Sequence, residues 1–229
     1  MRYEKIKSGI FIKRPNRFVA HVLTEGKEEI CHVKNTGRCR ELLIPGVSVI
    51  LAEGKGTGRK TKYDLVAVNK AGQWINMDSQ APNQAVWEWI LEGNLFSKEA
   101  HVQREKKYKA SRFDLYVEEK DRKAFLEVKG VTLEENQTAK FPDAPTARGI
   151  KHIQELIQCT EDGYEAYLIF VIQMKGIREF CPNWDTQPEL GENLIKAQNA
   201  GVHILAWDCR VTESEMKLDQ PVFVNLTKE

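Results

Sequence analysis

The sequence lacks a hydrophobic segment long enough to cross a bilayer. Its longest apolar stretch ends at Ile172 and is far shorter than the roughly 20 residues that a membrane span needs. The first residues, MRYEKIKSGIFIKR, also lack the apolar segment of roughly 7–15 residues that a secretory signal requires. We therefore expect a cytoplasmic protein that has no membrane partner.

Cysteine is sparse, and its spacing excludes two classes of small domain. The chain has five cysteines, with no CxxC pair and no histidines at zinc-finger spacing. They are Cys31, Cys39, Cys159, Cys181 and Cys209. An odd set of this kind is typical of free thiols in a reducing cytosol, not of a disulfide framework or a zinc finger.

The net charge is close to zero, but it is unevenly distributed. Residues 1–70 contain 15 Lys and Arg against 7 Asp and Glu, a surplus of +8, which leaves 19 against 26, or −7, for residues 71–229. A basic region attracts polyanions, so we expect nucleic acid to dock on the N-terminal part. A basic face that serves only solubility is the alternative.

The first part of the sequence has the pattern of a small β-barrel. Short segments in which apolar and polar residues alternate run from Gly9 to Met77 and are separated by turn residues. The segments are GIFIK, RFVAHVL, EEICHV, VSVILA, DLVAV and QWINM. This spacing fits a five-stranded barrel of OB type, a fold that often binds oligonucleotides, with one helical turn over residues 38–43.

After Asp78 the hydrophobic period changes to that of an α/β domain, whose first helix takes Asn83 as its N-cap and Gly93 as its stop. The expected order is helix, three strands, helix, strand, helix and strand, at residues 83–91, 101–109, 112–117, 124–129, 146–159, 164–172, 189–201 and 202–207. We therefore predict a two-domain α/β (α+β) protein. An OB-like barrel spans residues 1–80, and an α/β domain with a mixed central sheet spans residues 81–229.

Two carboxylates of the α/β domain are expected to meet across a hairpin. If the turn is centred on Lys120 and Asp121, Asp114 lies directly opposite Glu127, with β-carbons about 4.5–5.5 Å apart. The regular alternation of the strand places Phe113, Leu115 and Val117 on the opposite face from Asp114. Like charges at this distance repel each other, and a hard divalent cation removes that repulsion.

These carboxylates and a lysine two residues further supply the parts of a phosphodiesterase. Mg²⁺ or Mn²⁺ held by Asp114 and Glu127 would activate a water and polarise a phosphate, and Lys129 would orient the water or stabilise the charge that develops. Glu88, on the preceding helix, is a candidate further metal ligand. The ExK tripeptide occurs six times in this chain, so a surface ladder of ion pairs remains the alternative.

Several basic residues are candidates for contact with nucleic acid. The segment GKGTGRKT resembles a phosphate-binding loop, but Arg59 stands where a glycine is needed and a strand follows instead of a helix, so we reject nucleotide hydrolysis. The candidate contact residues are Arg14, Arg17, Arg38, Arg59, Lys60 and Lys62 in the barrel and Arg148, Lys151 and His152 near the start of a helix.

Several segments of the chain resemble the bacterial and archaeal family named sugar fermentation stimulation protein. The matching segments are NRFVAHV, NTGRCRELLIPG, RKTKYDLV, SRFDLYVEE, FLEVKGVTL, FPDAPTARGIKHIQEL and AGVHILAWDC. The resemblance runs nearly from end to end. It implies an OB-type domain followed by a restriction-endonuclease-like αβββαβ domain of the PD-(D/E)XK superfamily, and it implies DNA binding.

By this resemblance, Asp114, Glu127 and Lys129 match the nuclease signature, and Glu88 matches an acidic helix position that often joins it. The chain departs from the commoner family pattern at Lys34, where proline is usual, and at Met174, where arginine often stands.

Three functions follow from these observations. The first is a magnesium-dependent nuclease that acts on DNA, which would call for a homodimer if it cut both strands. The second is a non-catalytic DNA-binding regulator of sugar-utilisation genes that retains a nuclease fold. The third replaces DNA by RNA, since OB barrels accept either nucleic acid.

Overall fold

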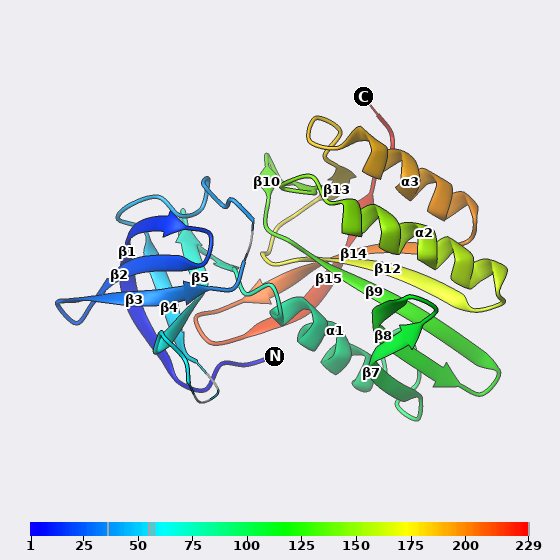
Figure 1. Ribbon diagram of the computed structural model, residues 1–229, viewed down its shortest axis with the longest axis horizontal. Helices are drawn as coiled ribbons and strands as arrows, with labels where there is room; N and C mark the ends of the chain where they lie inside the picture. The colour runs from blue at the N-terminus through cyan, green and yellow to red at the C-terminus, as the bar shows by residue number, and fades with distance from the viewer. Residues whose placement is uncertain (36, 55, 57, 229) are drawn as a thin grey trace.

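The computed structural model describes residues 1–35, 37–54, 56 and 58–228. It consists of a β-barrel, formed by the N-terminal third of the chain, beside a larger domain built on a mixed sheet (Figure 1). The three helices are α1 (Ala81–Leu91), α2 (Ala147–Glu161) and α3 (Pro188–Asn199).

Five strands close the barrel, and a sixth extends it. The strands are β1 (Ile6–Asn16), β2 (Val19–Thr24), β3 (Lys27–Val33), β4 (Ser48–Glu53), β5 (Tyr63–Lys70) and β6 (Gln73–Asn76). Their order is β3-β2-β1-β4-β5-β6, and a parallel pairing of β3 with β5 closes the ring. This is the predicted OB-type barrel, and the predicted turn after β3 is held by the Leu43 N–H on the Cys39 carbonyl at 3.0 Å.

The second domain contains one nine-stranded sheet with the order β10-β11-β13-β15-β14-β12-β9-β8-β7. Its strands are β7 (His101–Tyr108), β8 (Ser111–Glu119), β9 (Arg122–Val131), β10 (Glu134–Glu135), β11 (Thr138–Phe141), β12 (Glu165–Ile172), β13 (Glu179–Pro182), β14 (His203–Val211) and β15 (Met216–Val224). The hairpins β7–β8 and β8–β9 are antiparallel, whereas β9, β12 and β14 run parallel, so the sheet is mixed as predicted.

Helices cover both faces of this sheet. Helices α2 and α3 lie together on one face and α1 lies on the other (Figure 1). The apolar side chains under α2 and α3, such as Phe170 and Leu156, form one continuous cluster with the interior of the barrel. The side chains under α1, such as Leu115 and Val128, form a separate cluster. The shared cluster ties the two domains together.

The sequence missed four strands and misplaced one helix start. Strands β10, β11 and β13 are short. In β15, the residues Asp219, Gln220 and Pro221 interrupt the alternation of apolar residues. Helix α1 begins two residues earlier than predicted, with Gln80 at its N-cap position and a proline in its first turn. Asn83 is therefore not the N-cap, and its side chain is free to serve another purpose.

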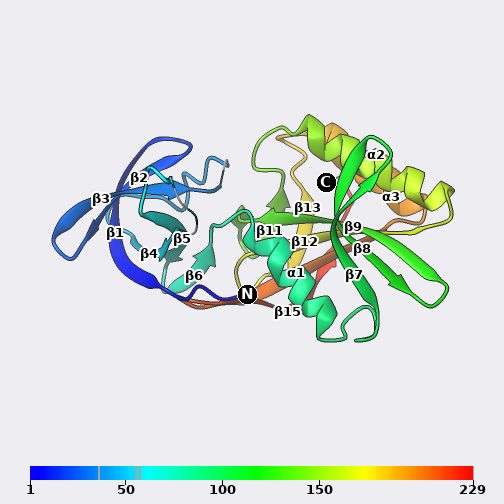
Figure 2. The ribbon, with the colours of Figure 1, turned by 60° about the horizontal axis from the view of Figure 1, so that its bottom comes forward.

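The buried side chain of Gln173 fastens the segment between the domains to the large sheet. Gln173 is 1% exposed, and its amide nitrogen donates to the Asn76 carbonyl at 3.1 Å, the Asn76 side chain at 2.9 Å and the Asp78 carbonyl at 3.2 Å. The N-terminal segment crosses the same junction, where the Tyr3 N–H donates to the Ser214 carbonyl at 2.8 Å (Figure 2). The relative position of the domains is thus set by specific hydrogen bonds as well as by apolar packing.

Cys31, Cys39, Cys159 and Cys209 are buried free thiols, and burial raises the pKa of the Cys31 thiol to about 12. None of the helices within the described ranges combines the length and the hydropathy that a membrane span requires.

We expect Gln173→Ala to lower the melting temperature by about 5 °C, because it removes a buried amide donor that three carbonyl oxygens share. Differential scanning calorimetry of both proteins measures this change. The matched control is Gln158→Ala, whose amide donates to the exposed Glu161 and to no other residue that the structure describes. Equal melting temperatures for wild type and Gln173→Ala would contradict the role given to this side chain.

Candidate metal and nucleic-acid site

The two strands of the β8–β9 hairpin stop pairing at Asp114. The strands pair from Glu119 and Arg122 to Leu115 and Leu126, which is the predicted register, and the pairing ends there. In the next row of the ladder, the Val128 N–H donates to Oδ2 of the Asp114 carboxylate at 2.8 Å. A side chain thus replaces the backbone of β8 in the ladder, and the two strands separate at this point.

Neighbouring residues show the same distortion. Glu105 of β7, which lies opposite Asp114, has a positive φ of 52°, an uncommon conformation for a residue other than glycine. Phe113 packs on the α2 side of the sheet, whereas Leu115 and Val117 pack on the α1 side. The predicted regular alternation through these residues is therefore wrong, because the strand changes its facing at Asp114.

Helix α1 supplies the second partner of this carboxylate. Asn83 Nδ2 donates to Asp114 Oδ1 at 2.6 Å. Nothing in the sequence pattern marked Asn83 for this contact, because the two residues are 31 positions apart. Both oxygens of Asp114 are therefore held, one by the sheet and one by a helix.

Glu127 is held on one oxygen only. Its carboxylate is 2% exposed, and Oε1 receives Lys129 Nζ at 2.5 Å and His152 Nδ1. The other oxygen, Oε2, is buried and has no hydrogen-bond partner among the described residues. A buried carboxylate oxygen without a partner costs free energy, so this atom marks a place where a cation fits.

The two carboxylates differ in their electrostatics. Burial, together with the charge of Glu127, raises the pKa of Asp114 to about 6. Burial acts on Glu127 in the same direction, but the contacts with His152 and Lys129 outweigh it and lower the pKa of Glu127. The pair thus holds one firmly ionised carboxylate beside one that ionises only near neutral pH.

Helix α2 brings His152 and Arg148 to the site. The helix begins after Thr146, whose hydroxyl accepts the Gly149 N–H at 2.9 Å. Arg148 Nε donates to His152 Nε2 at 3.3 Å, which leaves the N–H on Nδ1 to donate to Glu127. His152 was predicted only as a phosphate contact. Its spacing from Glu127 gave no sign that the two would touch.

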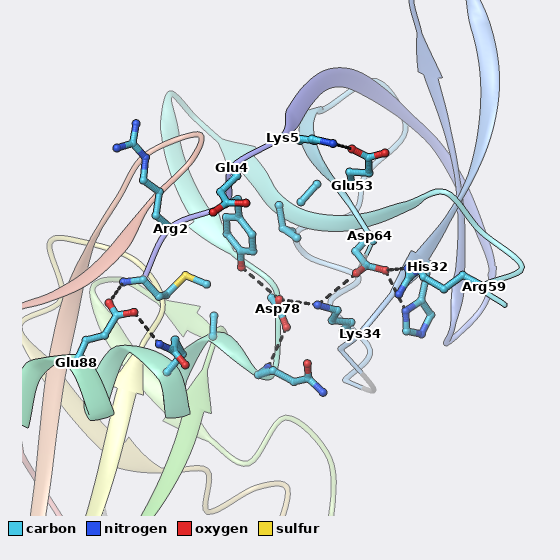
Figure 3. A pocket seen from close by; sticks show the side chains of 18 of the residues that line it. Arg2, Glu4, Lys5, His32, Lys34, Glu53, Arg59, Asp64, Asp78 and Glu88 are labelled. Atoms are coloured by element: carbon cyan, nitrogen blue, oxygen red, sulfur yellow. Dashed lines mark hydrogen bonds and ion pairs between the residues drawn. The ribbon is translucent and has the colours of Figure 1, made fainter. Parts of the chain in front are cut away.

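Glu88 does not join the other carboxylates. It lies on another face of α1, where Oε2 pairs with the Met1 ammonium at 2.7 Å and Oε1 accepts from Gln84 at 2.7 Å. It lines a cleft of about 900 Å³ between the barrel and α1 (Figure 3). The helix turns Glu88 away from the face that carries Asn83, so the structure does not place it as a ligand of the same metal.

One of the predicted DNA contacts, Arg59, lines the same cleft and forms an ion pair there. Arg59 pairs with the buried Asp64, and Lys34 bridges Asp64 and Asp78 at 3.2 and 3.1 Å (Figure 3). Arg59 therefore serves to neutralise a buried acid. Lys34, which departs from the family pattern, has the same function.

The other basic candidates differ in whether their side chains already form contacts within the protein. Arg14 donates four hydrogen bonds to backbone carbonyls, so we leave it and Arg59 out of the proposed DNA contacts. Lys62 lies over the Tyr63 ring at 5.1 Å. The side chains of Arg17, Arg38, Lys60 and Lys151 are exposed.

The donor set fits a hard divalent cation. The described residues contain no group of three or more His, Cys, Asp and Glu side chains arranged around one point. The site offers two carboxylates instead, with the remaining positions left to water and substrate, as is common for Mg²⁺.

The fold and the site together define a two-domain protein, in which an OB-type barrel precedes a mixed-sheet domain with a carboxylate, lysine and histidine cluster at the fork of its sheet. Two family models match the chain. The SfsA N-terminal OB domain matches residues 12–77, and the sugar fermentation stimulation protein RE domain matches residues 80–215. The chain belongs to the sugar fermentation stimulation protein family.

Relatives of known sequence and structure support this assignment over the full length. The sugar fermentation stimulation protein homologs of Ruminiclostridium cellulolyticum and Desulfitobacterium hafniense are 56% and 55% identical to it, and the alignments cover 99% and 100% of this chain and 100% of each relative. The structure of Pyrococcus furiosus SfsA in complex with Ca²⁺ is 30% identical, with a TM-score of 0.87 over 98% of both chains.

We expect the stability of the metal-free protein to depend on the pH through Asp114. The pKa of this group is raised from 3.8 to about 6 on folding. The stability that the Asp114 carboxyl contributes is therefore complete below pH 3.8, and it is lost as the pH rises through 6. Asp114→Asn removes this loss, and the Asn83 amide can turn to accept the new N–H.

Urea denaturation in EDTA at several pH values measures the difference between Asp114→Asn and wild type. The free energy of unfolding of Asp114→Asn, relative to that of wild type, should increase by about 1–2 kcal/mol between pH 4 and pH 8. Asp121→Asn, in the exposed turn of the same hairpin, is the matched control. A difference that is the same at every pH would show that Asp114 is not the titrating group.

Proposed function

We propose that this protein is a magnesium-dependent nuclease that acts on DNA. The observation that carries the proposal is the unpartnered, buried Oε2 atom of Glu127 beside the half-buried carboxylate of Asp114. Two acids placed together at a break in a sheet destabilise the fold unless a cation joins them. A fold that needed only stability would place an apolar pair there, as Leu115 and Leu126 do in the adjoining row.

A relative supports the choice of cation. The structure of Pyrococcus furiosus SfsA was obtained in complex with Ca²⁺. Ca²⁺ and Mg²⁺ are both hard cations that prefer oxygen ligands, although Mg²⁺ demands a tighter geometry. In this chain, Asp114 and Glu127 would hold Mg²⁺ or Mn²⁺. When bound, such an ion lowers the pKa of its water and polarises a phosphate oxygen.

The neighbouring side chains have separate roles. His152 holds Glu127 Oε1 and so fixes the direction in which Oε2 points. Lys129 Nζ, which is partly exposed, neutralises charge on a phosphate that approaches Glu127. Asn83 and the Val128 N–H hold Asp114 in place. Asp114, Glu127 and Lys129 are thus the proposed catalytic residues, with Asn83 and His152 as positioning residues.

Exposed basic side chains supply the affinity for DNA. The surplus of +8 in residues 1–70 attracts the phosphate backbone. The proposed contacts are Arg17, Arg38, Lys60 and Lys62 on the barrel and Arg148 and Lys151 on α2. Binding through such contacts weakens steeply as the salt concentration rises.

We expect wild type to cleave labelled DNA with Mg²⁺ or Mn²⁺, and Asp114→Asn and Lys129→Ala to lose at least about 100-fold in rate, because each removes charge stabilisation at the reacting phosphate. Rates are compared at equal occupancy of single-stranded and duplex substrates. Lys123→Ala, an exposed lysine on the same strand, is the matched control and should retain the wild-type rate. Tight binding without cleavage of any substrate would favour the regulator instead.

We also expect Mg²⁺, Mn²⁺ and Ca²⁺ to raise the melting temperature of wild type at pH 8. A ligand at about 100 times its Kd stabilises the folded state by roughly 2.7 kcal/mol. The shift should shrink below pH 6, because Asp114, with a pKa of about 6, is then protonated and no longer binds the cation. Thermal-shift titrations with each ion measure this effect.

Asp114→Asn and Glu127→Gln should abolish the cation-induced shift, whereas Asp121→Asn should keep it. An equal shift in Asp114→Asn and wild type would place the cation elsewhere on the protein. This measurement does not require turnover, so it separates cation binding from cleavage.

A further inference from the structure

An exposed aromatic ring lies in the turn between β1 and β2. Phe18 is 45% exposed, although its backbone is fixed: its N–H donates to Asn16 Oδ1 at 2.9 Å, and its carbonyl accepts the Val33 N–H at 2.8 Å. The guanidinium carbon of Arg17 lies 4.7 Å from the ring centroid. A rigid backbone thus presents a flat apolar surface beside a cation.

Arg14 joins this turn to the loop after β3. Its Nη2 donates to the carbonyls of Arg17 at 2.8 Å and Asn35 at 2.7 Å, and its Nη1 donates to those of Gly37 and Arg38 at 2.9 Å. Four bonds from one guanidinium hold two separate segments of the barrel as one unit.

The same loop contacts the second domain next to the candidate site. The Arg38 N–H donates to Asp143 Oδ2 at 2.8 Å. Asp143 lies three residues before Thr146, which caps the helix that carries Arg148 and His152. Hydrogen bonds and a short stretch of chain therefore connect the Phe18 turn to the helix that carries His152, the partner of Glu127.

Cations along this route are without acidic partners. The side chains of Arg38 and Arg40 are exposed, and neither forms an ion pair or a side-chain hydrogen bond within the described part of the chain. Arg17 likewise has no carboxylate partner there, and its only described side-chain contact is with the Phe18 ring. By contrast, the guanidinium groups of Arg59 and Arg14 bond to an acid and to backbone carbonyls within the protein.

We propose that Phe18 stacks on a base of single-stranded DNA, while Arg17, Arg38 and Arg40 hold its backbone and lead the strand toward Asp114 and Glu127. The bases of a duplex are already stacked on one another and cannot offer a face to this ring. An aromatic platform beside unpaired cations is therefore suited to a single strand. This inference rests on the proposed function and specifies its substrate.

Fluorescence anisotropy with the full chain tests the proposal. Labelled single-stranded DNA, a duplex of the same sequence and the matched RNA are titrated in EDTA, so that no cleavage occurs. Wild type should bind the single strand most tightly, and Phe18→Ala should weaken that binding roughly tenfold while changing duplex binding little. Phe18→Tyr should retain the affinity, because it keeps the ring.

The matched control is Phe223→Ala, which removes an exposed ring, 68% accessible, on β15 of the other domain. It should leave binding unchanged. Equal affinity of Phe18→Ala and wild type for the single strand, or tighter binding of the RNA, would overturn this inference and leave the nuclease proposal standing. Failure to bind any DNA would overturn both.

Discussion

Two carboxylates side by side in a largely buried place repel each other, and the arrangement of the second domain offsets this repulsion from three directions. The sheet gives Asp114 the Val128 N–H, α1 gives it Asn83, and α2 gives Glu127 the ring of His152. Helices from opposite faces must therefore reach the same break in the sheet. If either helix shifted, one carboxylate would lose a partner that burial makes necessary.

Several contacts hold the barrel against this domain, among them the ion pair of Lys70 with Glu134 at 2.9 Å. On one side, Gln173 fastens the segment between the domains, and Lys34 neutralises Asp64 and Asp78 nearby. At the other, the loop after β3 reaches Asp143 through the Arg38 N–H. Several points of attachment prevent a simple rotation about any one of them. The basic loops of the barrel therefore keep a fixed relation to the carboxylates, as a substrate that spans both would require.

Regular periodicity predicted the barrel and the register of the β8–β9 hairpin, because alternation and a short turn leave few other pairings. The environment of the site depended on contacts between distant segments, which no local pattern contains. His152 was known only as a basic residue near a helix start, and Asn83 only as a cap. Glu88 matched a family position, yet it lies on a different face of α1 from Asn83, the residue that contacts Asp114.

The carboxylates also set the order in which ligands can bind. In the proposed function, the basic charge of the barrel attracts DNA, but Asp114 and Glu127 repel a phosphate that comes close to them. Lys129 offsets only part of this negative charge, since its ammonium already contacts Glu127 Oε1. A phosphate can therefore approach Glu127 Oε2 closely only after a cation has neutralised the pair. In the proposed function, the barrel would thus hold DNA at a distance in the absence of a cation, and the cation would control its entry to the site.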